Sequence, residues 1–427
     1  MSPAATPAAQ VQLDRDNPWP GLESYGELAQ HYFSGRAQER EELLRRVLDS
    51  SVTVLFGKSG LGKTSLLKAG VFPGLRDKGC LPVHLRLHLH RDAPAVCEQI
   101  QQAFARELTA HGIDHPAWGA NEGLWEYLHR ADLELWTPQN HLVRPVFVFD
   151  QFEELFTLGR SLPALVARFR NDLADLAENR IPTAIAQRLE AETSANALDL
   201  RAMPYKIVIT LREDFLAELE CWRGAMPSLR HNRMRLLPMS AAQAFAAVHN
   251  PRTEHVVNEV LARRVVAFLS SAGAPVQDEA ATEADSVASV EPALLSLFCR
   301  GLNEQRKRAG KQQFDAGLVE GAQNTIVADF YRDSLRDQSR QARRFVEEQL
   351  VTEHGFRNSY SIDDALTHGS LTAAELDTLV DRRLLRREHH LGTERVELTH
   401  DLLTRAVVEQ RAGRRHVEQR RRQGLLM

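Results

Sequence analysis

The sequence has few cysteines, no long apolar run and no excess of charge of one sign. Its 427 residues include 4 cysteines, and none belongs to a C-x-x-C pair that could begin a zinc site. The longest apolar stretches, such as 146–149 and 207–209, are far shorter than the roughly 20 residues of a membrane-spanning helix. Lysine and arginine number 53 against 57 aspartates and glutamates, so the net charge is -4. These absences exclude a C-x-x-C zinc finger, a membrane span and a uniformly basic surface for nonspecific nucleic-acid binding.

The composition is that of a soluble globular protein with two or three domains, since 43% of the residues are hydrophobic and 26% are charged. The amino terminus has neither a basic start nor an apolar segment typical of a secretory signal. We therefore expect a cytoplasmic protein whose cysteines are reduced.

Alternating strand and helix patterns predict an α/β fold in the first half of the chain. Buried strands are predicted at 52–56, 82–90, 146–149 and 206–211, with helical patterns between them. Such alternation favours a mostly parallel sheet with helices on both faces. We assign this core to residues 17–239, after a disordered leader at 1–16.

Helical patterns dominate after the core. Residues 240–342 are expected to form an all-helical lid, and the stretch 272–291 has almost no large apolar residue, which is typical of a mobile, solvated loop. In residues 343–410, helices are followed by two short strands around a turn at 391–393, an arrangement that suggests a winged helix. The arginine-rich end, 411–427, lacks an apolar face and is expected to be an exposed tail or helix end.

A phosphate-binding loop is the strongest motif in the chain. Residues 57–64 read GKSGLGKT and fit G-x-x-x-x-G-K-[ST] between a strand and a helical run, whereas the alternative is a plain glycine-rich turn. Backbone N–H groups of such a loop surround a phosphate, assisted by the helix N-terminus. Lys63 is expected to contact the β and γ phosphates and Thr64 to bind Mg²⁺. The predicted nucleotide-binding set of the loop is Gly57, Lys58, Ser59, Gly60, Leu61, Gly62, Lys63, Thr64 and Ser65.

An acidic motif follows the third predicted strand. Asp150 ends the apolar run 146–149 at the sheet edge where the phosphates would lie, and it is predicted to hold Mg²⁺ directly or through water. By itself this pattern also fits a carboxylate that caps a helix. Either Glu153 or Glu154 could polarise the water that attacks the γ-phosphate, and the sequence does not distinguish them.

Two further groups of polar residues are candidates for function, the first of them at the same edge. Arg212 ends the strand at 206–211 and could sense the γ-phosphate through bidentate contacts, or else pair with Glu213, Asp214 or another surface acid. His84, His88 and His90 alternate along a strand and could bind a metal, but a polar strand face is the favoured interpretation because Arg86 lies among them. No [NT]-K-x-D motif follows the loop, so ATP is favoured over GTP.

These motifs, in this order, resemble the STAND class of signal-transduction ATPases, and specifically the novel STAND NTPases. The segment Asn17 to Leu22, NPWPGL, and the segment Tyr32 to Arg36, YFSGR, resemble the entry motif of that group. DQFEELF at 150–156 and TLREDF at 210–215 resemble two further signatures. The resemblance covers residues 17–408.

The resemblance implies three more nucleotide contacts. Arg36 lies in the entry motif, and Pro292 looks like the lid proline that packs against adenine, although Val290 replaces the usual glycine two residues earlier. LTHD at 398–401 resembles the winged-helix motif whose histidine, here His400, contacts the ADP β-phosphate; the alternative is that His400 only caps the next helix.

The resemblance also implies a switch that is closed with ADP, opens and self-associates with ATP, hydrolyses slowly and serves bacterial defence or regulation with an effector or sensor partner in trans. The alternative is a DNA-acting ATPase that grips the duplex through its winged helix and six arginines. This alternative is not favoured, because the net charge is -4 and the His-Asp motif suits the switch. The arginines concerned are Arg411, Arg414, Arg415, Arg420, Arg421 and Arg422.

Overall fold

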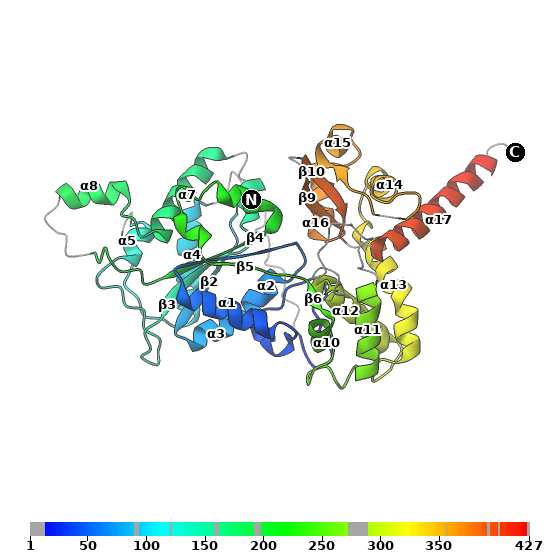
Figure 1. Cartoon of the computed structure of the whole chain (residues 1–427), viewed down its shortest axis with the longest axis horizontal. Helices are drawn as coiled ribbons and strands as arrows, with labels where there is room; N and C mark the ends of the chain where they lie inside the picture. The colour runs from blue at the N-terminus through cyan, green and yellow to red at the C-terminus, as the bar shows by residue number, and fades with distance from the viewer. Residues whose placement is uncertain are drawn as a thin grey trace, which may run out of the picture.

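A computed structural model of the chain describes residues 13–88, 94–119, 122–157, 162–191, 198–271, 289–355, 357–390, 393–399 and 402–424. Residues 1–12 of the predicted leader, the centre of the predicted loop at 272–291, and His90, His400 and Asp401 lie outside these residues. The chain forms an α/β core that fills one half of the molecule, and helices and a small carboxyl-terminal sheet that fill the other (Figure 1).

The core contains a five-stranded parallel sheet with the strand order β2-β3-β4-β1-β5. Alternate residues of a strand point to opposite faces, so Val146 and Val148 of β3 join one apolar cluster while Phe147 and Phe149 join another. Helices therefore cover both faces, as predicted for this α/β fold. The strands are β1 (Val52–Gly57), β2 (Cys80–Leu85), β3 (Arg144–Phe149), β4 (Lys206–Arg212) and β5 (Arg233–Arg235).

The helices of the core lie between these strands. They are α1 (Ala37–Asp49), α2 (Lys63–Ser65), α3 (Phe72–Asp77), α4 (Val96–Ala110), α5 (Leu124–Leu128), α6 (Glu153–Thr157), α7 (Pro163–Ala177), α8 (Thr183–Ala191) and α9 (Leu216–Glu220). Shorter or irregular turns are η1 (Glu27–Tyr32), η2 (Leu66–Val71), η5 (Glu213–Phe215) and η6 (Pro227–Arg230).

Two strand predictions differ from the structure. Strand β2 ends at Leu85, so the prediction that it continues to residue 90 was wrong within the described residues, where 86–88 are not strand. Strand β5 was missed because it is only three residues long and reads Arg-Met-Arg, with Met234 as its one buried side chain. A sheet-edge strand of this kind carries no apolar alternation that sequence patterns could detect.

The helical part after the core packs on its own apolar cluster, which also includes Trp19 from the start of the chain. Trp19 stacks on Phe314 with ring centroids 5.9 Å apart. Two-residue strands β6 (Met239–Ser240) and β7 (Ser289–Val290) pair here, so the predicted solvated loop does not extend through Val290. The helices are α10 (Ala241–Val248), α11 (Glu259–Ser271), α12 (Pro292–Arg308) and α13 (Ala316–Ser334).

The carboxyl-terminal part joins helices to a three-stranded antiparallel sheet with the order β8-β10-β9. The predicted strand pair is observed, with Leu385 opposite Leu398. Its cluster also includes Tyr331, so this packing unit already begins within α13. The elements are α14 (Arg340–Gln349), β8 (Tyr360–Ser361), α15 (Ile362–Thr367), α16 (Ala373–Asp381), β9 (Leu385–His390), β10 (Thr393–Leu398) and α17 (Leu402–Gly424).

The first residues of the arginine-rich segment 411–427 pack against the rest of the protein. Helix α17 continues through residue 424 and extends away from the body (Figure 1). Arg411 is 5% exposed and donates hydrogen bonds to the carbonyls of Glu347, Val351 and Thr352, and Arg414 pairs with Glu347. The prediction that this segment lacks a packing face was therefore wrong at Arg411 and Arg414, because the contacts use guanidinium groups rather than apolar side chains.

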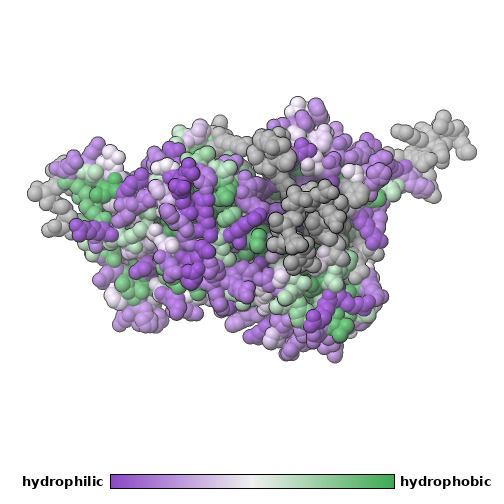
Figure 2. Space-filling model, in the orientation of Figure 1, coloured by the Kyte–Doolittle hydropathy of each residue, from purple (hydrophilic) through white to green (hydrophobic). Residues whose placement is uncertain are grey.

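No helix among the described residues is both long and apolar enough to cross a membrane. On the face drawn in Figure 2, hydrophilic side chains cover most of the core, and apolar residues form separate small patches.

Candidate functional site

The loop between β1 and α2 has the backbone that a phosphate-binding loop requires. Gly60 and Gly62 adopt φ angles of 81° and 84°, in the left-handed region that side chains disfavour. A β-carbon on Gly57 would lie 2.5 Å from the carbonyl oxygen of Leu236, so this position also has no room for a side chain. Lys63 begins α2 and donates hydrogen bonds from Nζ to the carbonyls of Gly57 and Lys58, at 2.8 and 3.0 Å.

Asp150 connects three elements at the carboxyl edge of the sheet. Its carboxylate accepts hydrogen bonds from Thr64 Oγ1 at 2.7 Å and Thr210 Oγ1 at 2.5 Å, and it lies 3.1 Å from His84 Nε2. Burial alone raises the pKa of Asp150, but the contacts with His84, Thr210 and Thr64 outweigh burial and lower this pKa to about 2. The carboxylate is therefore ionised at neutral pH.

The pair formed by Thr64 and Asp150 suits a hard divalent cation. Both residues offer oxygen atoms, the ligand type that Mg²⁺ prefers, and the structure places these oxygens side by side, as the sequence predicts. His84 and Thr210 were not assigned to this site from the sequence. His84 approaches Asp150 from the end of β2, and the described residues contain no cluster of three or more histidine, cysteine, aspartate or glutamate side chains that could hold a metal.

The two glutamates after Asp150 have different surroundings. The backbone N–H of Arg212 donates to Glu153 Oε2 at 3.3 Å, and burial raises the pKa of Glu153 although Lys63 opposes that effect. Glu154 instead forms an ion pair with Arg86 at 2.5 Å. Glu153 is thus the carboxylate that shares its surroundings with the phosphate-loop lysine.

Arg212 joins the core to the carboxyl-terminal sheet. Its guanidinium forms an ion pair with Asp214 at 2.5 Å and also donates a hydrogen bond to the backbone carbonyl of Arg387 in β9. The sequence offered the pairing with Asp214 as the alternative to phosphate sensing, and the structure contains that pairing. The contact with Arg387 could not be read from the sequence, because 175 residues separate the two positions.

The start of α12 lies against the phosphate loop. Pro292 is the first residue of this helix, and the backbone N–H of the next residue, Ala293, donates to the carbonyl of Gly60 at 3.3 Å. The preceding residue, Glu291, lies 3.9 Å from Arg386 of β9. Core, helical lid and carboxyl-terminal sheet therefore meet beside the predicted nucleotide site.

The remaining predicted residues are placed as follows. Arg36 is 3% exposed, pairs with Glu39 at 2.5 Å and donates to the carbonyl of Leu237 at 2.7 Å. Ser65 Oγ accepts a hydrogen bond from the backbone of Tyr25 at 3.2 Å. The nucleotide contact of Arg36 stays a prediction, as does that of His400, which lies outside the described residues.

Comparison with known proteins gives one family and several distant structures. The family model described as Novel STAND NTPase 1 matches residues 18–420, and no curated protein matches the chain. The Aeropyrum pernix ORC2 protein, in ADPNP-ADP complexes, has a TM-score of 0.44 and 14% identity over 88% of this chain and 92% of its own. The Aeropyrum pernix ORC1 protein in complex with DNA has a TM-score of 0.43 and 13% identity over 88% and 93%. Cdc6p from Pyrobaculum aerophilum has a TM-score of 0.42 and 14% identity over 88% and 95%.

Proposed function

Because this chain belongs to the novel STAND NTPase 1 family, we propose that it is an ATP-dependent signalling switch. In this proposal the protein holds ADP in a closed form, opens and self-associates after exchange for ATP, and returns by slow hydrolysis. The observation that carries the proposal is the direct contact of Arg212, at the sheet edge, with β9 of the carboxyl-terminal part. A nucleotide bound beside such a contact can favour one arrangement of the two parts over the other.

The described residues fit a nucleotide with Mg²⁺. The phosphate loop would surround the phosphates, Lys63 would neutralise part of their charge, and Thr64 and Asp150 would hold the cation, which supplies further charge neutralisation. Pro292, to which the family resemblance assigns the contact with adenine, begins the helix whose next residue, Ala293, donates to Gly60. Glu153 would accept the proton of the attacking water.

The switch requires different affinities for the nucleotide in the two arrangements. A shift from 1:99 to 99:1 needs a difference of about 10⁴-fold, or about 5.5 kcal/mol. Hydrogen bonds to charged groups contribute about 1.5–3 kcal/mol each. The contacts of Arg212 with Arg387 and of Ala293 with Gly60 stabilise the closed arrangement itself. The difference in affinity has to come from groups that contact the nucleotide in only one arrangement, such as the predicted contact of His400.

The contact between Arg212 and Arg387 gives a prediction about the closed form. In Arg212→Ala, β9 and β10 are expected to exchange backbone hydrogen at least about tenfold faster, because one charge-assisted hydrogen bond across the junction is lost. Hydrogen-exchange mass spectrometry of the full chain measures this. Arg235→Ala removes a nearby exposed arginine that pairs with Glu213 within the core and should leave exchange at β9 unchanged. Equal exchange in the two variants would contradict a closing role for Arg212.

The switch itself is tested on the protein as purified. Mass spectrometry of the bound nucleotide should find ADP, and light scattering should detect a larger assembly after ATP and Mg²⁺ are added. An empty protein that hydrolyses ATP and stays monomeric would argue against the switch.

The DNA-acting alternative is less well supported. Two of the six arginines assigned to it, Arg411 and Arg414, already bind carbonyl and carboxylate oxygens of α14 and the loop after it. These two arginines cannot bind a duplex through the same guanidinium groups without losing those contacts.

A further inference from the structure

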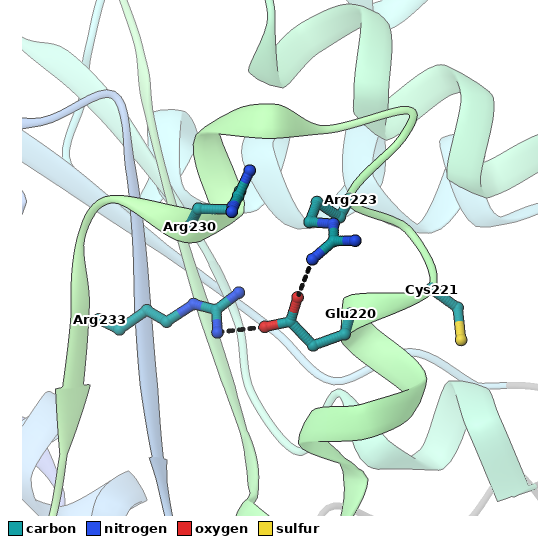
Figure 3. A pocket seen from close by; sticks show the side chains of 5 residues that line it. All are labelled: Glu220, Cys221, Arg223, Arg230 and Arg233. Carbon is teal, nitrogen blue, oxygen red and sulfur yellow. Dashed lines mark hydrogen bonds and ion pairs between the residues drawn. The ribbon is translucent and has the colours of Figure 1, made fainter.

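A hollow lined mainly by arginine lies on the core between α9 and β5. Its volume is about 680 Å³, and it is lined by Glu220, Cys221, Arg223, Arg230 and Arg233. Figure 3 shows the guanidinium groups of Arg233 and Arg223 directed at the carboxylate of Glu220, with Arg230 on the same side of the hollow but not joined to it, and the thiol of Cys221 pointing away.

The carboxylate of Glu220 neutralises only part of the positive charge of the three arginines. Glu220 pairs with Arg233, and its other oxygen lies 3.9 Å from Arg223. Hydrogen bonding from Arg233 lowers the pKa of Glu220, and the charges of Arg233, Arg223 and Arg230 lower it further. Three guanidinium groups and one carboxylate leave two positive charges in the lining.

Some of the N–H groups of these arginines have no hydrogen-bond acceptor among the described residues. Arg230 is exposed and forms no hydrogen bond or ion pair with any residue that the structure describes. Arg233 donates from Nε to the carbonyl of Leu229 at 2.5 Å, but its buried Nη2 has no hydrogen-bond partner there. The exposed guanidinium of Arg230, which lines the hollow, is available to donate to an acceptor there.

The hollow is separate from the nucleotide site. Strand β5 runs parallel to β1, and Arg233 lies opposite Val54, three residues before Gly57. At about 3.3 Å per residue this places Arg233 about 10 Å from the phosphate loop, toward the amino ends of the strands. Glu220 pairs with Arg233 and lies 3.9 Å from Arg223, so these residues lie beside Arg233. The anion for this hollow is therefore not a phosphate of the nucleotide bound by the same chain's loop.

The geometry points to a second anion site, one that binds a terminal phosphate group carried by another molecule. A phosphate monoester has a charge of about -1.5 to -2 at neutral pH, which matches the two unbalanced positive charges. A carboxylate or a phosphate diester carries only one negative charge. Planar guanidinium groups also form paired hydrogen bonds with phosphate oxygens.

The experiment uses the full-length chain with Mg²⁺ADP present and measures binding by fluorescence anisotropy. The probes are a short labelled oligonucleotide with a 5′-phosphate and the same oligonucleotide with a 5′-hydroxyl, and inorganic phosphate is the competitor. We expect the 5′-phosphate probe to bind at least about tenfold tighter and inorganic phosphate to displace it. In R223Q/R230Q its affinity should fall at least about tenfold.

Two control variants separate this site from other sources of binding. Arg106→Gln removes one exposed arginine of α4 and should not change the affinity, whereas a general charge effect would lower it. Lys78→Ala removes an exposed lysine of the core and should also leave the affinity unchanged, while saturating Mg²⁺ADP keeps the nucleotide site filled in every variant. Equal binding of the two oligonucleotides would overturn the preference for a terminal phosphate. Unchanged binding by a folded R223Q/R230Q protein would overturn the site.

Discussion

Lys63→Ala is expected to weaken binding of ATP and ADP by about 100-fold or more. Lys63 Nζ lies within hydrogen-bond distance of two carbonyls of the phosphate loop, at the centre of the ring of N–H groups that would hold the phosphates. Each hydrogen bond to a charged group is worth about 1.5–3 kcal/mol, and the loss of two such bonds to phosphate gives the expected change. Isothermal titration calorimetry with Mg²⁺ATP and Mg²⁺ADP measures it.

The electrostatics around Lys63 support the same expectation. Burial lowers the pKa of the Lys63 ammonium, and the carboxylates of Glu153 and Asp150 oppose that shift. Removal of this ammonium leaves both carboxylates facing the phosphates with less compensating positive charge.

A matched control separates this effect from loss of folding. Lys78→Ala removes an exposed lysine of the core and should bind nucleotide as the unmodified protein does. Thermal unfolding without nucleotide should show that the Lys63→Ala protein is folded. Nucleotide affinity within about threefold of the control would contradict the assignment of the loop.

The sequence predicts the parts of the site that follow local rules. Gly60, Gly62 and Lys63 are recognisable because a phosphate loop needs fixed backbone angles and a fixed spacing. Asp150 is recognisable because parallel strands bring their carboxyl ends to one edge. The four longer strands of the sheet are found from their apolar runs.

The parts that sequence reasoning missed depend on tertiary contacts. His84 reaches Asp150 only because β2 and β3 are neighbours in the sheet. Local sequence patterns predict single strands but not the order of the strands in the sheet. The carbonyl of Arg387 belongs to the backbone, so no side-chain motif marks it. Arg411 is buried through hydrogen bonds to carbonyls, and a charge run predicts exposure instead.

The two glutamates after Asp150 give the second large prediction. Glu153→Gln is expected to lower the rate constant of ATP hydrolysis by about 100-fold to 10,000-fold, the range usual for loss of a general base. Nucleotide affinity should change little, because the amide keeps the size of the carboxylate. Glu154→Gln is the matched control and should lower the rate only a few-fold, since its half-exposed partner Arg86 makes the lost ion pair weak.

The pH dependence distinguishes a base from a positioning group. Burial raises the pKa of Glu153 above its ordinary value of 4.5, and a general base works only in its ionised form. The hydrolysis rate should therefore fall as the pH is lowered through this raised pKa. The decrease should begin at a higher pH than it would for a glutamate with an ordinary pKa. The Glu154→Gln variant should show the same pH dependence as the unmodified protein.

The residual hydrolysis rate of Glu153→Gln should not show this decrease at low pH, because the amide does not titrate. Single-turnover hydrolysis of labelled ATP between pH 5 and pH 8 tests both expectations, since it isolates the chemical step from product release. A larger loss in Glu154→Gln than in Glu153→Gln would reverse the assignment of the base. Hydrolysis retained in the double variant would exclude both carboxylates and require water to be activated by the phosphate itself or by another group at the sheet edge.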